Sequence, residues 1–212
     1  WHSSDILVAK AGDPGKLPLA GRVVVPTKNG LEAIYYGKNA KGRFSILNVV
    51  WNSGQIGHVE FVGDGSGPAL SLEANRFADV IEKWMSGEVR SDKLWFCNKA
   101  NPNFVLLPGT DEADFSLYLM TAQQQKDVYP FGGHHRVDIA ARKVIAERAY
   151  SKSCLDFDMA NIPAQDPMMF VNHLLDPVPT EVHVFTALSA QAPVIVMTTA
   201  NNKSWLIQPR KT

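Results

Sequence analysis

Short segments rich in branched and aromatic residues fill the first 68 residues of this chain, and glycine, asparagine and lysine clusters separate them. Four of these segments are GRVVVP, LEAIYYG, RFSILNVVW and IGHVEFVG. Such segments are typical of β-strands. The sequence KNAKGR, between Gly37 and Phe44, has the composition of a hairpin connection. The first 68 residues are therefore predicted to form β-structure.

A helix is predicted over residues 71–86. Its apolar side chains follow the spacing i, i+3, i+4 and i+7, which places them on one stripe of a helix: Phe77, Val80, Ile81 and Trp84. Ser71 can cap the start of this helix and Gly87 can end it. The stripe is expected to face a core.

Strand-like segments return after residue 93, as KLWFC, NFVLLP, DFSLYLMTA, HHRVDI and KVIAERAY. Beyond the proline-rich DPVPTE, the segment VHVFTAL favours a short helix capped by Thr180, although Val182 and Val184 also alternate as in a strand. VIVMTT and SWLIQ then flank the turn ANNK.

Many short strands and few helices indicate an α+β fold with a largely antiparallel β-sheet, one clear amphipathic helix and a short C-terminal helix. We expect a single domain over residues 1–212; two sub-lobes that divide near residues 87–114 are the alternative.

Net charge argues against a nucleic-acid partner, and hydropathy argues against a transmembrane segment. Lys plus Arg and Asp plus Glu each number 21, so the net charge is zero, and the basic field that nucleic-acid binding requires is missing. No apolar run reaches the roughly 18–20 residues of a transmembrane helix. We expect no nucleic-acid partner and no transmembrane segment.

The two cysteines, Cys97 and Cys154, leave two alternatives open. In an oxidising compartment they could form a disulfide, which would contribute about 3–4 kcal/mol by closing a long loop. Otherwise both are reduced and buried. A disulfide would favour a periplasmic or secreted protein.

The segment YPFGGHHRVDI contains His134 and His135 directly after two glycines. Adjacent residues of a strand point to opposite faces, so at most one of these histidines can join a given site. One interpretation is that Gly132 and Gly133 form a turn, one histidine packs against Phe131 and the other is solvated. The alternative is a metal or catalytic role.

A zinc site is the second hypothesis for the histidines. His173 and His183 flank the proline-rich bend, and either His134 or His135 could be the third ligand, with Glu181 as the general base. Glu181 lies two residues before His183, so on a helix the two side chains would diverge. This geometry counts against the site.

The C-terminal stretch from His173 to Ile207 resembles the closing half of the JAB/MPN metalloprotease-like domain, in which a histidine-rich turn precedes a capped helix and a hairpin. The zinc motif of that family is His-x-His, seven residues, Ser, two residues, then Asp, with an upstream glutamate as base. His173 matches the second histidine and Thr180 stands near the serine position. The resemblance implies a degenerate member, because the remaining positions differ: Val171 replaces the first histidine, His183 the aspartate and Phe131 an acidic residue.

The sequence contains no complete catalytic motif, charge bias or cofactor fingerprint, while aromatic residues near turns, such as Trp51, Trp95 and Tyr129, suit contact surfaces. We therefore expect an exported bacterial binding protein that recognises another protein or an envelope component without catalysis. The alternative is a metal-dependent (zinc) hydrolase of JAB/MPN-like type.

Overall fold

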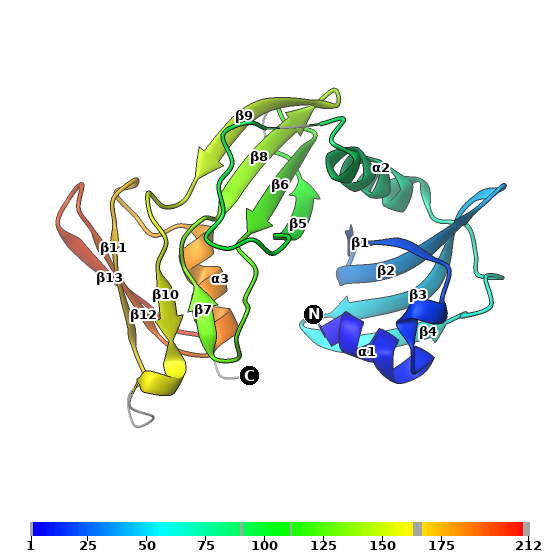
Figure 1. The fold of residues 1–212 in the computed structure, drawn as a ribbon, viewed down its shortest axis with the longest axis horizontal. Coiled ribbons are helices and arrows are strands. Elements are labelled where there is room, and N and C mark those ends of the chain that lie inside the picture. Colours follow the sequence, from blue (N-terminus) through cyan, green and yellow to red (C-terminus); the bar gives the residue numbers. More distant parts are fainter. Residues whose placement is uncertain (1, 90, 111, 163–166, 210–212) are drawn as a thin grey trace. The chain divides into compact units, whose positions relative to one another are not determined.

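A computed structural model describes residues 2–89, 91–110, 112–162 and 167–209 (Figure 1). The chain divides into two compact units, residues 1–90 and residues 91–212. The choice between a single domain over residues 1–212 and two sub-lobes that divide near residues 87–114 stays a prediction.

The N-terminal unit contains a four-stranded antiparallel sheet whose strands pair in sequence order. The strands are β1 (Leu19–Thr27), β2 (Gly30–Asn39), β3 (Gly42–Asn52) and β4 (Gln55–Phe61). Asn39 pairs with Gly42 at the end of the β2–β3 hairpin, where the KNAKGR segment predicts a turn. This part of the β-prediction is confirmed.

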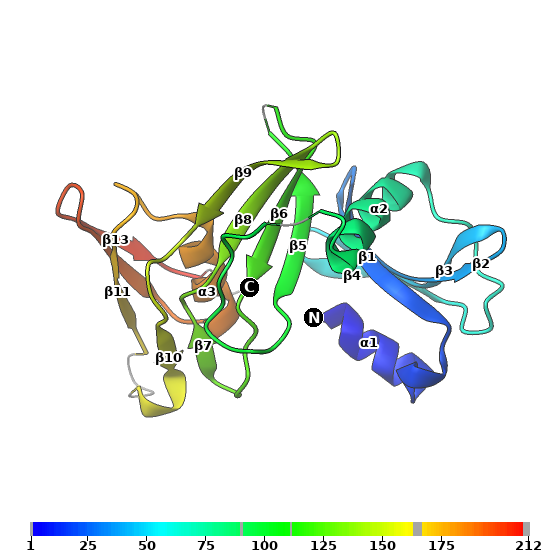
Figure 2. The same ribbon diagram turned by 45° about the horizontal axis from the view of Figure 1, so that its top comes forward.

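A helix that the sequence does not predict precedes the sheet. Helix α1 spans His2–Ala11 and is followed by the 3-10 helix η1 (Pro14–Lys16). Leu7 of α1 is buried against a sheet face formed by Ala33, Tyr35, Leu47 and Val49, and Figure 2 shows α1 along that sheet. The prediction of β-structure throughout residues 1–68 is therefore wrong here. The helix depends on tertiary packing of Leu7, which a ten-residue pattern does not reveal.

Helix α2 (Leu72–Ser86) lies within the range that the apolar stripe predicts. The Ser71 side chain accepts a hydrogen bond from the backbone of Ala74, and Gly87 ends the helix in the left-handed conformation. Of the four stripe residues, Phe77 and Ile81 are buried, whereas Val80 and Trp84 are only partly buried.

Ion pairs attach α2 to the β2–β3 hairpin. The Arg43 guanidinium donates to both carboxylate oxygens of Glu82, at 3.0 and 2.7 Å, and to Asp79 at 2.7 Å. Tyr36 donates to Glu82 at 2.8 Å. Burial alone would raise the pKa of Glu82, but hydrogen bonds from Arg43, Lys38 and Tyr36 outweigh it and lower this pKa to about 2.

The C-terminal unit begins with a four-stranded antiparallel sheet of order β5-β6-β8-β9. Its strands are β5 (Asn103–Pro108), β6 (Phe115–Met120), β8 (His135–Ala140) and β9 (Lys143–Ala149). The predicted strand KLWFC is wrong: residues 93–97 are irregular, because Trp95 and Phe96 pack on His135 and Cys97 is held by a disulfide instead of by strand pairing. A smaller antiparallel pair joins β7 (Val128–Pro130) to β10 (Asp156–Asp158), and the 3-10 helix η2 (Met159–Asn161) follows.

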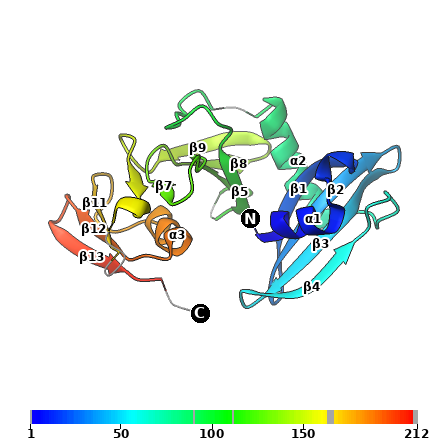
Figure 3. The ribbon, with the colours of Figure 1, turned by 60° about the horizontal axis from the view of Figure 1, so that its bottom comes forward.

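The last part of this unit is a three-stranded sheet with one helix. Strand β11 (Met169–His173) is parallel to β12 (Val194–Thr198), which forms a hairpin with β13 (Lys203–Ile207). Helix α3 (Glu181–Ala190) connects β11 to β12, and Figure 3 shows it on one face of the three strands. VHVFTAL is thus helical, as favoured. The strand alternative fails because His183 and Ala187, four residues apart, are both buried.

The fold is α+β with mostly antiparallel sheets; β11–β12 is a parallel pair. None of the helices in the described ranges combines the length and apolarity needed to cross a membrane.

Cys97 and Cys154 form a disulfide, with their Cα atoms 5.5 Å apart. This resolves the choice between paired and reduced cysteines. The bond closes a loop of 57 residues in sequence, which includes β5 to β9.

We predict that replacing both cysteines by alanine lowers the unfolding free energy of the C-terminal unit by roughly 2–4 kcal/mol, because the unfolded chain regains the freedom that the closed loop removes. Denaturant unfolding of the wild type and the double variant measures this. The wild type, unfolded without reductant, should show no reactive thiol; two titratable thiols would contradict the disulfide.

Candidate functional site

The two glycines of the GGHH segment lie against the disulfide. Gly133 has a φ of +69°, and a methyl group there would lie 3.0 Å from the Cys97 sulfur and 2.7 Å from the Thr121 hydroxyl. At Gly132 a methyl group would meet the Ser153 carbonyl and lie 2.7 Å from the Cα atom of Cys154. The glycines therefore allow both cysteine-bearing segments to approach the turn.

His134 uses both ring nitrogens in hydrogen bonds to the backbone. Its Nδ1 accepts from the Thr121 N–H at 3.0 Å, so Nε2 carries the proton and donates to the Pro130 carbonyl at 3.0 Å. Burial lowers the pKa of His134 to about 4. This imidazole is neutral and links Pro130 of β7 to Thr121, the residue that follows β6.

His135 points elsewhere, as expected for the next residue of a strand. Its Nε2 lies 2.6 Å from the Trp95 carbonyl, and the rings of Trp95 and Phe96 contact its ring edge-on. Burial also lowers the pKa of His135. The interpretation that one of the two histidines is solvated is wrong: both are buried, because residues 95–97 cover the strand where the disulfide fixes them.

His173 and His183 do come together. Their rings meet edge-on with centroids 4.6 Å apart, and Phe131 packs against His183. The Nε2 atom of His173 lies 2.7 Å from a carboxylate oxygen of Asp176, which also accepts from Arg148 at 2.7 Å. A histidine, an aspartate and an arginine thus form one connected polar group at the end of β11.

His183 belongs to the start of α3. Its Nδ1 accepts from the backbone N–H of Thr180 at 3.0 Å, and the Thr180 hydroxyl lies 2.8 Å from the same nitrogen. The proton is therefore on Nε2. Burial, followed by the effect of His173, lowers the pKa of His183 to about 4. In this capping box the His183 side chain accepts the hydrogen bond from the N-cap N–H that a glutamate side chain often accepts.

Glu181 faces a different group of residues. It accepts hydrogen bonds from Tyr118, at 2.9 Å, and from Tyr150, and an Arg136 nitrogen lies 3.9 Å away. Burial would raise the pKa of Glu181, but the two tyrosine hydroxyls are among the groups that lower it. Glu181 and His183 have separate partners, as the helical spacing predicts.

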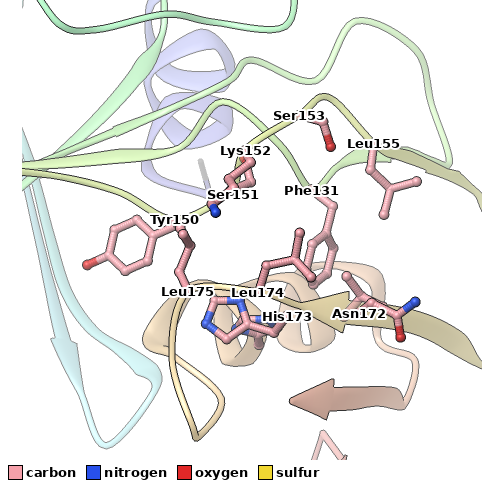
Figure 4. A pocket seen from close by; sticks show the side chains of 12 residues that line it. Phe131, Tyr150, Ser151, Lys152, Ser153, Leu155, Asn172, His173, Leu174 and Leu175 are labelled. Carbon is pink, nitrogen blue, oxygen red and sulfur yellow. The ribbon is translucent and has the colours of Figure 1, made fainter. Parts of the chain in front are cut away.

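A pocket of about 430 Å³, open solvent included, lies between residues 150–155 and 171–175. Figure 4 shows side chains of both segments around one space, with His173 and Leu174 opposite Ser153 and Leu155. Its apolar lining residues are Phe131, Leu155, Val171, Leu174 and Leu175; the polar ones are Tyr150, Ser151, Lys152, Ser153, Asn172, His173 and His183.

The structure therefore assembles only part of the predicted zinc site. His173 and His183 are neighbours, whereas the hydrogen bonds of His134 and His135 hold them in other surroundings. Within the described residues, no group of three or more His, Cys, Asp or Glu side chains could hold a metal ion.

Sequence reasoning missed Arg148, Tyr118 and Tyr150. Arg148 lies on β9, Tyr150 directly follows that strand, and Tyr118 lies on β6. Strand pairing places them on one sheet, and tertiary packing then brings the two tyrosines to Glu181 and Arg148 to Asp176. No spacing along the chain signals this arrangement.

Comparisons with protein-family models, curated proteins and solved structures found no match for this chain. The resemblance to the JAB/MPN domain stays a prediction.

We predict that Gly133→Ala lowers the unfolding free energy by roughly 2–4 kcal/mol, because the methyl group meets Thr121 and Cys97 and the backbone conformation is left-handed. Gly12→Ala is the matched control: Gly12 has a φ of +68° and open space around its Cα, so about 1 kcal/mol is expected. Equal losses in denaturant unfolding would show that backbone strain alone, not the close packing, requires Gly133.

The buried histidines predict a pH dependence of stability. The pKa of His134 is about 4 in the folded chain, below the ordinary value of 6.5, so the unfolded state binds the proton first and stability falls as pH decreases from 6.5 towards 4. Between pH 7.5 and 5 the loss is roughly 2 kcal/mol for this histidine. Denaturant unfolding at several pH values over this range gives the free energy of unfolding as a function of pH. This free energy should fall less steeply with decreasing pH in His134→Gln than in the wild type. Equal pH dependence in the two proteins would contradict the buried neutral imidazole.

Proposed function

We propose that this protein is an exported bacterial binding protein that recognises another protein or an envelope component without catalysis. The observation that carries the proposal is an apolar sheet face in the C-terminal unit. On β11–β13, alternate residues point away from α3, and Phe170, Ile195 and Leu206 form one cross-strand row. Met197 lies on the same face one row further along.

This face, defined by Phe170, Ile195, Met197 and Leu206, is here called the outer face. Phe170 is 60%, Leu206 56% and Met197 48% exposed to solvent. Contiguous exposed apolar side chains on a sheet are typical of protein-binding surfaces. The neighbouring positions Asn172 and Ser204 are polar and uncharged, so a partner would not have to desolvate a charge there.

The hydrogen bonds around the histidines also support a binding role. Glu181, the expected base, accepts from two tyrosines, and its pKa is lowered rather than raised. A general base that works near neutral pH needs a raised carboxylate pKa. His183 likewise has its unprotonated nitrogen occupied by the backbone of Thr180.

The disulfide supports the choice of compartment. Cys97 and Cys154 are paired, and such bonds persist in the periplasm and outside the cell. A periplasmic or secreted location is therefore part of the proposal.

The second candidate is a zinc hydrolase, which the proximity of His173 and His183 favours. A catalytic zinc ion needs three protein ligands and an open water position. The two histidines and Asp176 would be the nearest donors, but Asp176 is shared with Arg148.

We predict that the double variant Phe170→Ser and Leu206→Ser loses capture of its partner from a periplasmic extract by tenfold or more. Burying one such side chain contributes roughly 1.5–3 kcal/mol, and 1.4 kcal/mol corresponds to a tenfold change in affinity. Both residues are exposed, so the fold should persist. Leu72→Ser is the control, because Leu72 is 82% exposed in the N-terminal unit.

One set of results would contradict the binding proposal. Stoichiometric zinc in the purified protein that is lost in His173→Ala, together with turnover of a hydrolase substrate and no captured partner, would replace the binding proposal with the hydrolase.

A further inference from the structure

The pocket between residues 150–155 and 171–175 combines an apolar wall with an uncompensated cation. Phe131, Leu155, Val171, Leu174 and Leu175 supply the apolar side chains, and Lys152 is also among the residues that line the pocket. Leu174 and Leu175 are partly in solvent, so the apolar surface continues out of the pocket. A ligand that matches this lining has an apolar part beside an anionic group.

The charges around the pocket identify Lys152 as the group that can bind an anion. Arg148 is not available, because it donates to Asp176 at 2.7 Å, and His173 lies 2.7 Å from the same carboxylate. Within the described part of the chain Lys152 has no ion-pair partner. The negative charge of Asp176 is thus neutralised by Arg148, whereas the positive charge of Lys152 has no such partner among the described residues.

Hydrogen-bond donors accompany this charge. The Ser151 hydroxyl accepts from the Gly133 N–H at 3.1 Å, which leaves its own O–H free to donate. The backbone N–H groups of Lys152 and Ser153 donate to no backbone carbonyl of the described residues. An ammonium group with nearby hydroxyl and N–H donors suits a carboxylate.

The segment that carries these donors is fixed before any ligand binds. The disulfide to Cys97 holds Cys154, and the Leu155 carbonyl accepts from the Phe131 N–H at 2.7 Å. A donor group that is already ordered loses little conformational freedom on binding.

We propose that this pocket binds the C-terminal residue of a partner polypeptide, with an apolar side chain in the pocket and the free carboxylate at Lys152, Ser151 and Ser153. A chain end places a carboxylate directly beside its last side chain, which matches an ammonium group beside an apolar lining. Leu174 and Leu175 then contact the preceding residues. The inference rests on the proposed role in protein binding and adds a recognition site distinct from the outer face.

The test compares peptides with matched variants of the full chain. The probes are a five-residue peptide that ends in leucine with a free carboxylate, the same peptide with a C-terminal amide, and octanoate; binding is measured by calorimetric titration. We expect amidation to weaken binding tenfold or more. Lys152→Gln should weaken the free-acid peptide equally and leave the amide unchanged. Lys143→Gln, at an exposed lysine of the same unit outside the pocket, should change neither.

Several outcomes would overturn the inference: no binding of the free-acid peptide, equal affinity for acid and amide, or an unchanged affinity in Lys152→Gln. Octanoate binding as tightly as the peptide would make this a site for small aliphatic acids instead. If the peptides fail while partner capture still depends on Phe170 and Leu206, the pocket inference falls and the proposed binding function stands.

Discussion

The Cys97–Cys154 disulfide and the two glycines beneath it fix the centre of the C-terminal unit. Cys97 follows the aromatic residues that cover His135, and Cys154 belongs to the segment that forms one wall of the pocket. Both cysteine segments approach the backbone at Gly132 and Gly133 so closely that any side chain there would collide with them. The cross-link, the turn and the pocket wall therefore depend on one another.

Buried histidines are the second organising feature of this unit. A buried imidazole is stable when it is neutral and its nitrogens have partners. His134 meets that condition with two backbone hydrogen bonds, and His183 meets it in part at the start of α3. These hydrogen bonds explain why histidines occur at the two positions. The number of histidines in this unit is therefore weak evidence for a metal site. His173 differs because its partner is a carboxylate.

Two surface features of the C-terminal unit fit the proposed binding role. The outer face offers apolar area without charge, while the pocket combines apolar walls with one unbalanced lysine. The carboxylates that could support catalysis are held by tyrosine or arginine partners. The proposed recognition of a polypeptide would use both surface features, and it would require no group to change its protonation.

The sequence by itself determined most of the strands, helix α2 with its caps at Ser71 and Gly87, and the helical state of the segment after Thr180. These follow from local periodicity and capping, which act over a few residues. Helix α1, the disulfide pairing and the neighbours of each histidine were decided by tertiary structure. Adjacent positions such as His134 and His135 have separate surroundings because segments distant in sequence, at Thr121 and Trp95, supply their partners. Such contacts depend on strand register and on which distant segments pack together. Neither can be read from the spacing of residues along the chain.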